Sequence, residues 1–186
     1  MNAQGFLPQK GNFRNLIAFQ KAECIYDITY HFAHRFLSKG DRTVDQMIQA
    51  ARSGRQNIAE GASASTTSSE TEIKLLNVAK ASLQELLLDY EDYLRVRNLE
   101  IWHIDDPRSI QTRKVCSSHN DSAYYREAIQ VRSDEVICNL AITLIHQTDV
   151  FLRKLINRCK EDFLNNGGIK EQMYNARKDY RSKHGR

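Results

Sequence analysis

The chain has 186 residues, 27 basic and 23 acidic side chains and a formal net charge of +4. This length suits one domain with a single core and is too short for two comfortable domains. The N-terminus lacks an apolar leader, and no eighteen consecutive residues are apolar, so neither a signal peptide nor a membrane span is expected. We therefore predict a cytoplasmic protein. Only two prolines interrupt the chain, which favours long helices over a sheet.

The first predicted helix covers about 15–38 and is apolar on two faces. A helix with two apolar faces is buried twice, so we expect it to pack once in its own bundle and once against a neighbouring subunit. One face repeats at alternating spacings of three and four residues, and the second runs beside it. The first face is Leu16, Phe19, Tyr26, Tyr30, Ala33 and Leu37, and the second is Ile17, Cys24, Ile28, Phe32 and Phe36.

The second predicted helix, about 43–60, begins at a capping box opened by Thr43 and is rich in small residues. Glycine inside a helix costs about 1 kcal/mol relative to alanine, so another element must pack very close to this helix. Asn57 and Glu60, in the last turn, are interpreted as structural hydrogen-bonding groups, and Gly61 as a left-handed C-cap. The small residues are Ala50, Ala51, Ser53 and Gly54.

Two further long helices complete the pattern. Residues 62–68 are rich in serine and threonine and are predicted to form a mobile loop. The third helix covers about 69–97 and begins at a capping box opened by Ser69, and the fourth covers about 133–165 after Ser133. Each of these two helices is about 45 Å long at 1.5 Å per residue. The fold class that buries all four apolar faces is all-α, an up-down four-helix bundle.

The predicted domain division assigns residues 1–168 to the bundle and residues 169–186 to a basic tail. The insert at 98–132, between the third and fourth helices, is far longer than the connections typical of bundles. Within it, 107–118 and 122–129 are each predicted to form a short helix. We interpret the insert as a small ordered cap on one end of the bundle.

The C-terminal tail carries all the excess positive charge. It holds six basic residues against two acidic ones, whereas the rest of the chain is neutral. We predict a short basic helix there, with Ile169, Met173, Ala176 and Tyr180 on one face. Such an arm suits nucleic acid or another polyanion, and a solvated tail that keeps the protein soluble explains the same charge equally well.

No catalytic or metal centre is indicated. A di-iron bundle needs a Glu-x-x-His pair on each of two helices, and the only such pair, Glu100 and His103, falls beyond the third helix. The sequence has no nucleophile elbow, Gly-rich loop or CxxC pair. We predict a non-enzymatic protein without metal or cofactor, whose cysteines are buried thiols and whose His31, His34 and His146 are surface or satisfied core histidines.

Basic residues with aromatic neighbours form a candidate nucleic-acid surface. Arg52 and Arg55 are neighbours on one face of the second helix, and Tyr174 and Tyr180 lie among the basic residues of the tail. Phosphate contacts from such groups depend strongly on salt and carry little sequence specificity, and ordinary surface ion pairs are the open alternative. The candidate RNA- or DNA-binding residues are Arg52, Arg55, Lys74, Lys80, Lys170, Arg177, Lys178, Arg181 and Lys183.

One pattern links the second and third helices, and the run 16–22 at the start of the first helix accompanies it. The pattern consists of Gln46, Ala50, Ala51, Ser53, Asn57, Ile58, Ala59, Glu60 and Gly61, followed by Ala79, Ser82, Glu85 and Leu86. It resembles the four-helix-bundle family of ribosomal RNA intervening-sequence proteins, which includes the accessory variability determinants of diversity-generating retroelements. The long insert and basic tail resemble the four-helix-bundle suffix-domain subgroup of that family.

The resemblance implies a bacterial, homopentameric barrel of bundles that binds RNA or DNA without catalysis, beside a reverse transcriptase or a ribosomal RNA element. Ile48 and Gln49 stand where the family has two basic residues, so Arg52 and Arg55 would relocate the basic surface. A second hypothesis, from a different class, is a protein–protein adaptor whose helices serve assembly alone. The residues that carry the structural motif are Asn57, Glu60, Gly61, Ser82 and Glu85.

Overall fold

The computed structural model describes residues 12–65 and 68–185, and every regular element in these ranges is a helix. The expectation of an all-α protein is thus confirmed for the described residues. The elements are η1 (Phe13–Asn15, a 3₁₀ turn), α1 (Ile17–Phe36), α2 (Arg42–Ala64), α3 (Ser69–Val96), α4 (Pro107–Ser118), α5 (Ser122–Ala128), α6 (Asp134–Asn166) and α7 (Ile169–His184).

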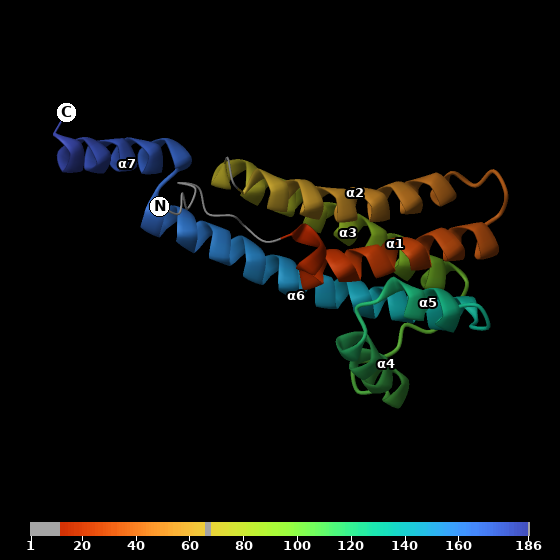
Figure 1. The fold of residues 1–186 in the computed structure, drawn as a ribbon. Helices are drawn as coiled ribbons and strands as arrows, with labels where there is room; N and C mark the ends of the chain where they lie inside the picture. Colours follow the sequence, from red (N-terminus) through yellow and green to blue (C-terminus); the bar gives the residue numbers. More distant parts are fainter. Residues whose placement is uncertain (1–11, 66–67, 186) are drawn as a thin grey trace.

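The four long helices α1, α2, α3 and α6 lie side by side around one core (Figure 1). Helix α1 packs against α2 and α6, and α3 packs against the same two helices. Each long helix therefore has two long neighbours, and the apolar stripes of all four meet in the middle. α7 projects beyond the end of these helices (Figure 1).

An aromatic cluster fixes α1 against α3 inside the core. The ring of Phe32 lies 5.1 Å from that of Tyr90 and 4.8 Å from that of Tyr93, centroid to centroid. The Tyr90 hydroxyl is fully buried and lies 2.9 Å from the Thr29 hydroxyl, which satisfies both polar groups away from water. This buried polar pair links α1 to α3 within the core.

The helix starts fit the sequence closely, but two caps lie earlier than predicted. Asp41, not Thr43, caps α2, because its carboxylate accepts a hydrogen bond from the Thr43 backbone N–H at 2.9 Å. Ser68, not Ser69, caps α3 through the Thr71 N–H. Ser133 caps α6 as predicted. Where two capping residues stand close together in a sequence, the one whose oxygen reaches a free helix N–H takes the cap.

Helices α2 and α3 approach closely where α2 has its glycines. A Cβ atom added at Gly54 would lie 2.7 Å from Leu83 Cδ2. A Cβ atom at Gly61 would lie 3.4 Å from three atoms of α3. The predicted left-handed cap at Gly61 is wrong, since α2 continues to Ala64 and Gly61 has no positive φ. Gly61 is small because of close packing, and Thr66 and Thr67 of the predicted loop lie outside the described residues.

The insert forms the two predicted helices and lies on the flank of the long helices, not at one end. Helix α5 packs against α1, and α4 packs against α6. Helix α5 of the same chain therefore covers part of the surface of α1. Tyr125 of α5 is fully buried and donates its hydroxyl to the His119 carbonyl at 2.9 Å.

One stretch within Asp134–Lys183 is long and apolar enough, by length and composition alone, to cross a membrane. Half of that stretch is buried inside the molecule. Its buried residues in α6, such as Leu144 and Leu152, belong to the core shared with α1 and α3. Core helices pass this test as readily as membrane spans do.

Candidate nucleic-acid interface

The structure separates the predicted basic residues of α2 and α3. Arg52 is exposed on α2, and the Arg55 guanidinium lies 4.3 Å from the centroid of the Tyr26 ring. On α3, Lys74 pairs with Glu70 at 2.8 Å, and Lys80 pairs with Asp149 of α6 at 3.6 Å. The α3 lysines thus face acidic partners, whereas Arg55 of α2 lies against an aromatic ring.

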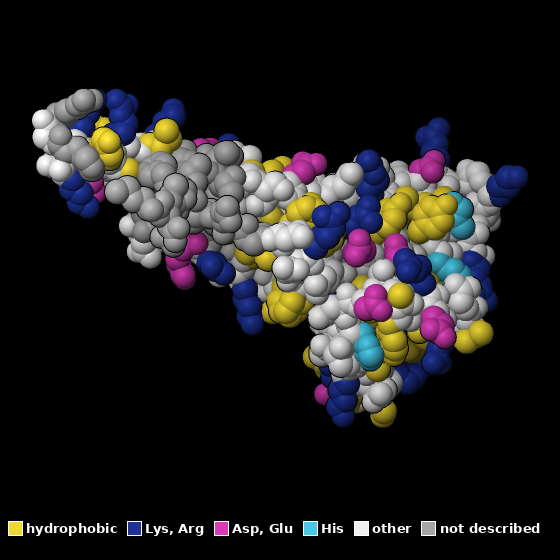
Figure 2. Space-filling model, in the orientation of Figure 1, with side chains coloured by type: hydrophobic (Ala, Val, Ile, Leu, Met, Phe, Trp, Pro, Cys, Tyr) yellow, Lys and Arg dark blue, Asp and Glu magenta, His cyan; other side chains and the backbone are white. Residues whose placement is uncertain are grey.

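The basic residues of α7 gather on a helix that stands clear of the long helices. Lys170, Arg177, Lys178, Arg181 and Lys183 are all exposed. Exposed Met173, Tyr174 and Tyr180 lie among them. Figure 2 shows dark blue and yellow side chains together at this end of the molecule. The chain enters α7 after Gly167, whose φ of +68° directs the helix away from the end of α6.

Three aromatic residues at four-residue spacing form a second feature, on α1. Tyr26, Tyr30 and His34, here called the aromatic ledge, follow one face of the helix because side chains four residues apart are neighbours. The ring centroids of Tyr26 and Tyr30 are 6.4 Å apart, and those of Tyr30 and His34 are 4.3 Å apart. The sequence placed Tyr30 on an apolar face expected to be buried in the bundle or against a neighbouring subunit, and in the single chain it is 51% exposed.

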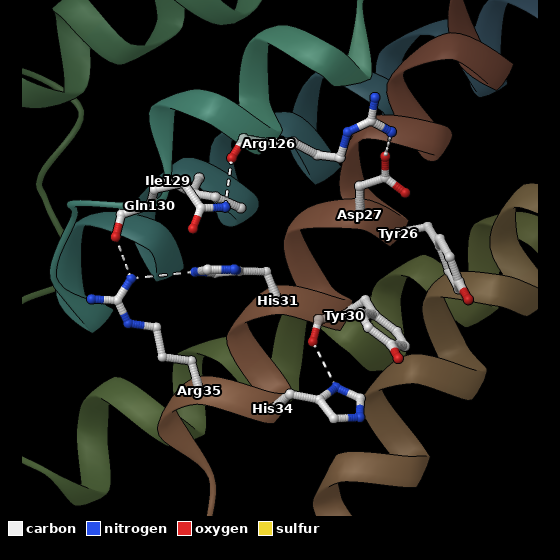
Figure 3. Close-up of a pocket in the computed structure, with 9 residues that line it drawn as sticks. All are labelled: Tyr26, Asp27, Tyr30, His31, His34, Arg35, Arg126, Ile129 and Gln130. Carbon is white, nitrogen blue, oxygen red and sulfur yellow. Dashed lines mark hydrogen bonds and ion pairs between the residues drawn. The ribbon is translucent and has the colours of Figure 1, made fainter.

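The ledge borders an open hollow of about 540 Å³ between α1 and the end of α5. Figure 3 shows His31 and Arg35 pointing toward the α5 side of this hollow, with Tyr26 and Tyr30 on the opposite side. Arg35 donates a 2.5 Å hydrogen bond to the Gln130 carbonyl, and Arg126 pairs with Asp27 at 3.0 Å.

The two histidines beside this hollow differ in their bonding. Burial and the Arg35 guanidinium lower the pKa of His31 below its usual value, so its neutral ring can accept from Arg35 at 3.4 Å. The Nδ1 atom of His34 lies 2.8 Å from the Tyr30 carbonyl. A carbonyl only accepts, so this nitrogen carries the hydrogen, and the bond fixes the His34 ring on the ledge.

Arginines surround the ledge. The Arg55 guanidinium lies over the Tyr26 ring, at one end of the ledge. Arg35 and Arg126 line the hollow, and Arg126 is paired with Asp27. Figure 2 shows dark blue, yellow and cyan side chains gathered on the face formed by α1 and α2. Exposed aromatic rings beside basic side chains are the combination that binds nucleotide bases and phosphates together.

The residues of the family-like pattern lie mainly between helices. The hydroxyl oxygens of Ser53 and Ser82 are 2.9 Å apart across α2 and α3, and the Asn57 amide donates to the Ser53 carbonyl at 2.9 Å. Glu60 and Glu85 are exposed. Within this pattern the Ser53–Ser82 pair joins the two helices, and none of these polar residues lines the hollow.

Lys21 is a buried polar contact that the sequence did not reveal. Its side chain is 1% exposed, and its ammonium donates to the Cys116 carbonyl at 2.5 Å and to the Gln147 amide oxygen at 3.0 Å. Burial lowers the pKa of Lys21. This residue links α1, α4 and α6. Its place in an apolar stretch, among Ala18, Ala22 and Ile25, was the available signal.

The described residues contain no cluster of three or more His, Cys, Asp or Glu side chains that could hold a metal ion. All four cysteines are buried and none of them forms a disulfide, as the sequence predicted. Burial raises the pKa of Cys24 to about 12 and that of Cys116 to about 11, so these thiols stay protonated near neutral pH. His34 and His146 are exposed, and His31 is half-buried.

Comparison of the chain with family models, with curated proteins and with solved structures returns no match.

Proposed function

We propose that this protein is a non-enzymatic, oligomeric, up-down four-helix-bundle protein that binds RNA or DNA. Five exposed cations on α7, a helix that projects beyond the other helices, carry the proposal. Lysine and arginine on such an arm neutralise phosphates and release counterions, which supplies most of the affinity of non-specific binding. Arg52 and Arg55 extend the proposed contact surface onto α2.

The assembly and the setting of this activity rest on the resemblance of α2 and α3. We propose a homopentamer that acts in the cytoplasm as an accessory to a reverse transcriptase or a ribosomal RNA element. Small residues of that pattern lie where α2 meets α3, at Gly61, where an added Cβ would lie 3.4 Å from atoms of α3, and at the Ser53–Ser82 contact. The resemblance thus supports the packing of α2 against α3, and binding of RNA or DNA is measured in the experiment below.

Fluorescence anisotropy with labelled RNA and DNA at about 50 mM and about 200 mM salt tests binding through α7. Five phosphate contacts predict an affinity loss across this range of about 500-fold for duplex DNA and about 130-fold for a single strand. Changing Lys170, Arg177, Lys178, Arg181 and Lys183 to Gln should remove most of the binding and flatten the salt dependence. The control variant changes the same number of exposed cations elsewhere to Gln, at Lys39, Arg95, Lys114, Lys154 and Lys160.

Absence of binding at low salt would overturn the proposal, and so would equal losses in the α7 variant and its control. The control matters because both variants have the same net charge. A difference between them therefore reports the position of the cations and not the charge of the whole protein.

A protein–protein adaptor is the second candidate, and an apolar groove of about 450 Å³ favours it. The groove lies between α6 and the segment that leads into α4, and exposed Ile101, Ile104 and Val150 line it. Exposed apolar patches mark interaction surfaces. A specific partner that stays bound through nuclease and high salt, and that Ile104→Asp releases, would support this function in place of nucleic-acid binding.

A further inference from the structure

The aromatic ledge exposes the rings of Tyr30 and His34 to solvent. Tyr30 is 51% exposed, although apolar side chains of α1 elsewhere are fully buried in the core. The ring of His34 is held by its hydrogen bond to the Tyr30 carbonyl at 2.8 Å. A ring held in place before binding loses little conformational freedom when a ligand covers it.

The spacing of the rings suits unpaired bases and not a duplex. Neighbouring ring centroids of the ledge lie 6.4 Å and 4.3 Å apart, and the ring planes are tilted by 37° and 33°, whereas bases in a duplex stack about 3.4 Å apart along each strand. Duplex bases also have both faces covered by their neighbours. An extended single strand exposes its base faces and can place them on rings a helical turn apart.

The positive charges beside the ledge can bind the phosphates of a strand whose bases contact the rings. Arg55 lies 4.3 Å from the Tyr26 centroid at one end, and Arg35 lines the adjoining hollow. The carboxylate that lines the hollow, Asp27, is paired with Arg126 at 3.0 Å. Aromatic rings with arginines at their edge complement a polyanion more closely than they complement an apolar partner surface.

We propose that the aromatic ledge is a stacking platform for unpaired bases, which makes this protein prefer single-stranded nucleic acid over duplex. The proposal rests on the proposed nucleic-acid binding and adds the form of nucleic acid to it. The bases stack on Tyr30 and His34, while Arg55 and Arg35 contact the neighbouring phosphates. The sugar takes no part in this stacking, so RNA and DNA single strands bind in the same way.

The test compares the intact protein with a Tyr30→Leu/His34→Leu variant. Anisotropy is measured with a labelled oligonucleotide of about 12 nucleotides, as RNA and as DNA, each single-stranded and paired with its complement. The variant should bind both single strands at least about fivefold more weakly, the loss expected for one stacked base, and should bind the duplexes as the intact protein does. A single strand carrying 2-aminopurine adds a direct readout, because stacking on the ledge quenches its fluorescence.

The matched control is His119→Leu/Tyr124→Leu, which removes the same two residue types from another surface. The His119 and Tyr124 rings are parallel to 1° and 3.8 Å apart, so they stack on each other. This control should keep the single-strand preference and the quenching.

Equal weakening for single strands and duplexes, or an unchanged single-strand affinity in the Tyr30→Leu/His34→Leu variant, would overturn the stacking platform alone. A protein that binds neither form would overturn the proposed function as well. Circular dichroism on each variant establishes that it has folded.

Discussion

At the scale of single residues, the buried contacts of Lys21 show how one polar side chain can join three helices. Its stem crosses the core from α1, and its ammonium donates to acceptors on α4 and α6. Both acceptors are uncharged, so no carboxylate offsets the cost of burying the charge, and burial lowers the pKa of the lysine. The Lys21 ammonium supplies a hydrogen-bond donor to two acceptors inside the molecule, the Cys116 carbonyl and the Gln147 amide oxygen.

Lys21→Ala should therefore destabilise the fold by about 2–4 kcal/mol, because two acceptors lose their donor and a cavity remains. Lys21→Met keeps most of the stem and should cost less. Urea denaturation measures both variants, and exposed Lys39→Ala is the control, expected within about 0.5 kcal/mol of the unchanged protein. Equal stabilities for Lys21→Ala and Lys39→Ala would contradict this account.

The same lysine predicts a dependence on pH. Its pKa is 10.5 in an unfolded chain and lower in the folded protein, so between these values the unfolded chain binds more protons. Stability then rises with pH across that interval. Measured from about pH 7 to about pH 9.5, the intact protein should gain stability relative to Lys21→Met. A constant difference between the two proteins would show that Lys21 does not titrate there.

At the scale of elements, the close contact of α2 with α3 governs how far α2 can change. Gly54 is buried against Leu83, and a Cβ at its position would need Leu83 to move. Gly54→Val should destabilise the fold by about 1–3 kcal/mol through overpacking. Gln49→Val is the control, since it places the same β-branched residue on the exposed face of α2. Valine is a better helix former than glycine, so a loss of stability at Gly54 in thermal or urea unfolding that spares the control reports the packing effect.

The helices themselves were largely predictable, because the spacing of three and four residues between apolar positions can be read from the sequence alone. The predicted 107–118 and 122–129 correspond to α4 and α5, and only the helix ends shifted. The caps were misplaced by one or two residues because Asp41 and Ser68 compete with the residues just after them. Gly61 was misjudged because a glycine near a helix end fits both a cap and a close helix contact.

The candidate site was harder to predict than the helices. Tyr26 and Tyr30 belong to an apolar stripe in the sequence, and nothing in that stripe indicates that Tyr30 is half-exposed while Phe19 and Ala33 are buried. A periodic pattern gives the faces of a helix but not which of two apolar faces meets a neighbour. Lys21 was missed for the same reason, since its partners are 95 and 126 residues away in the chain.

At the scale of the whole molecule, the insert covers parts of α1 and α6 and so changes which surfaces an oligomer interface can use. Helix α5 already covers part of α1, while Ile17 and Tyr30 of the same helix are exposed. The groove beside α6 still exposes Ile101 and Ile104, the latter at 64%. If subunits assemble, this groove is the apolar surface that offers them an interface.

The proposed homopentamer gives a particle of about five times the 21.5 kDa of one chain. Light scattering coupled to size exclusion, or native mass spectrometry, measures this mass directly. Ile104→Asp should lower the mass, because a charge at an apolar interface loses its water without gaining a partner. Val131→Asp is the control, since Val131 is 87% exposed and lies outside the groove. A monomeric intact protein would contradict the assembly, and a pentamer unaffected by Ile104→Asp would place the interface on another face.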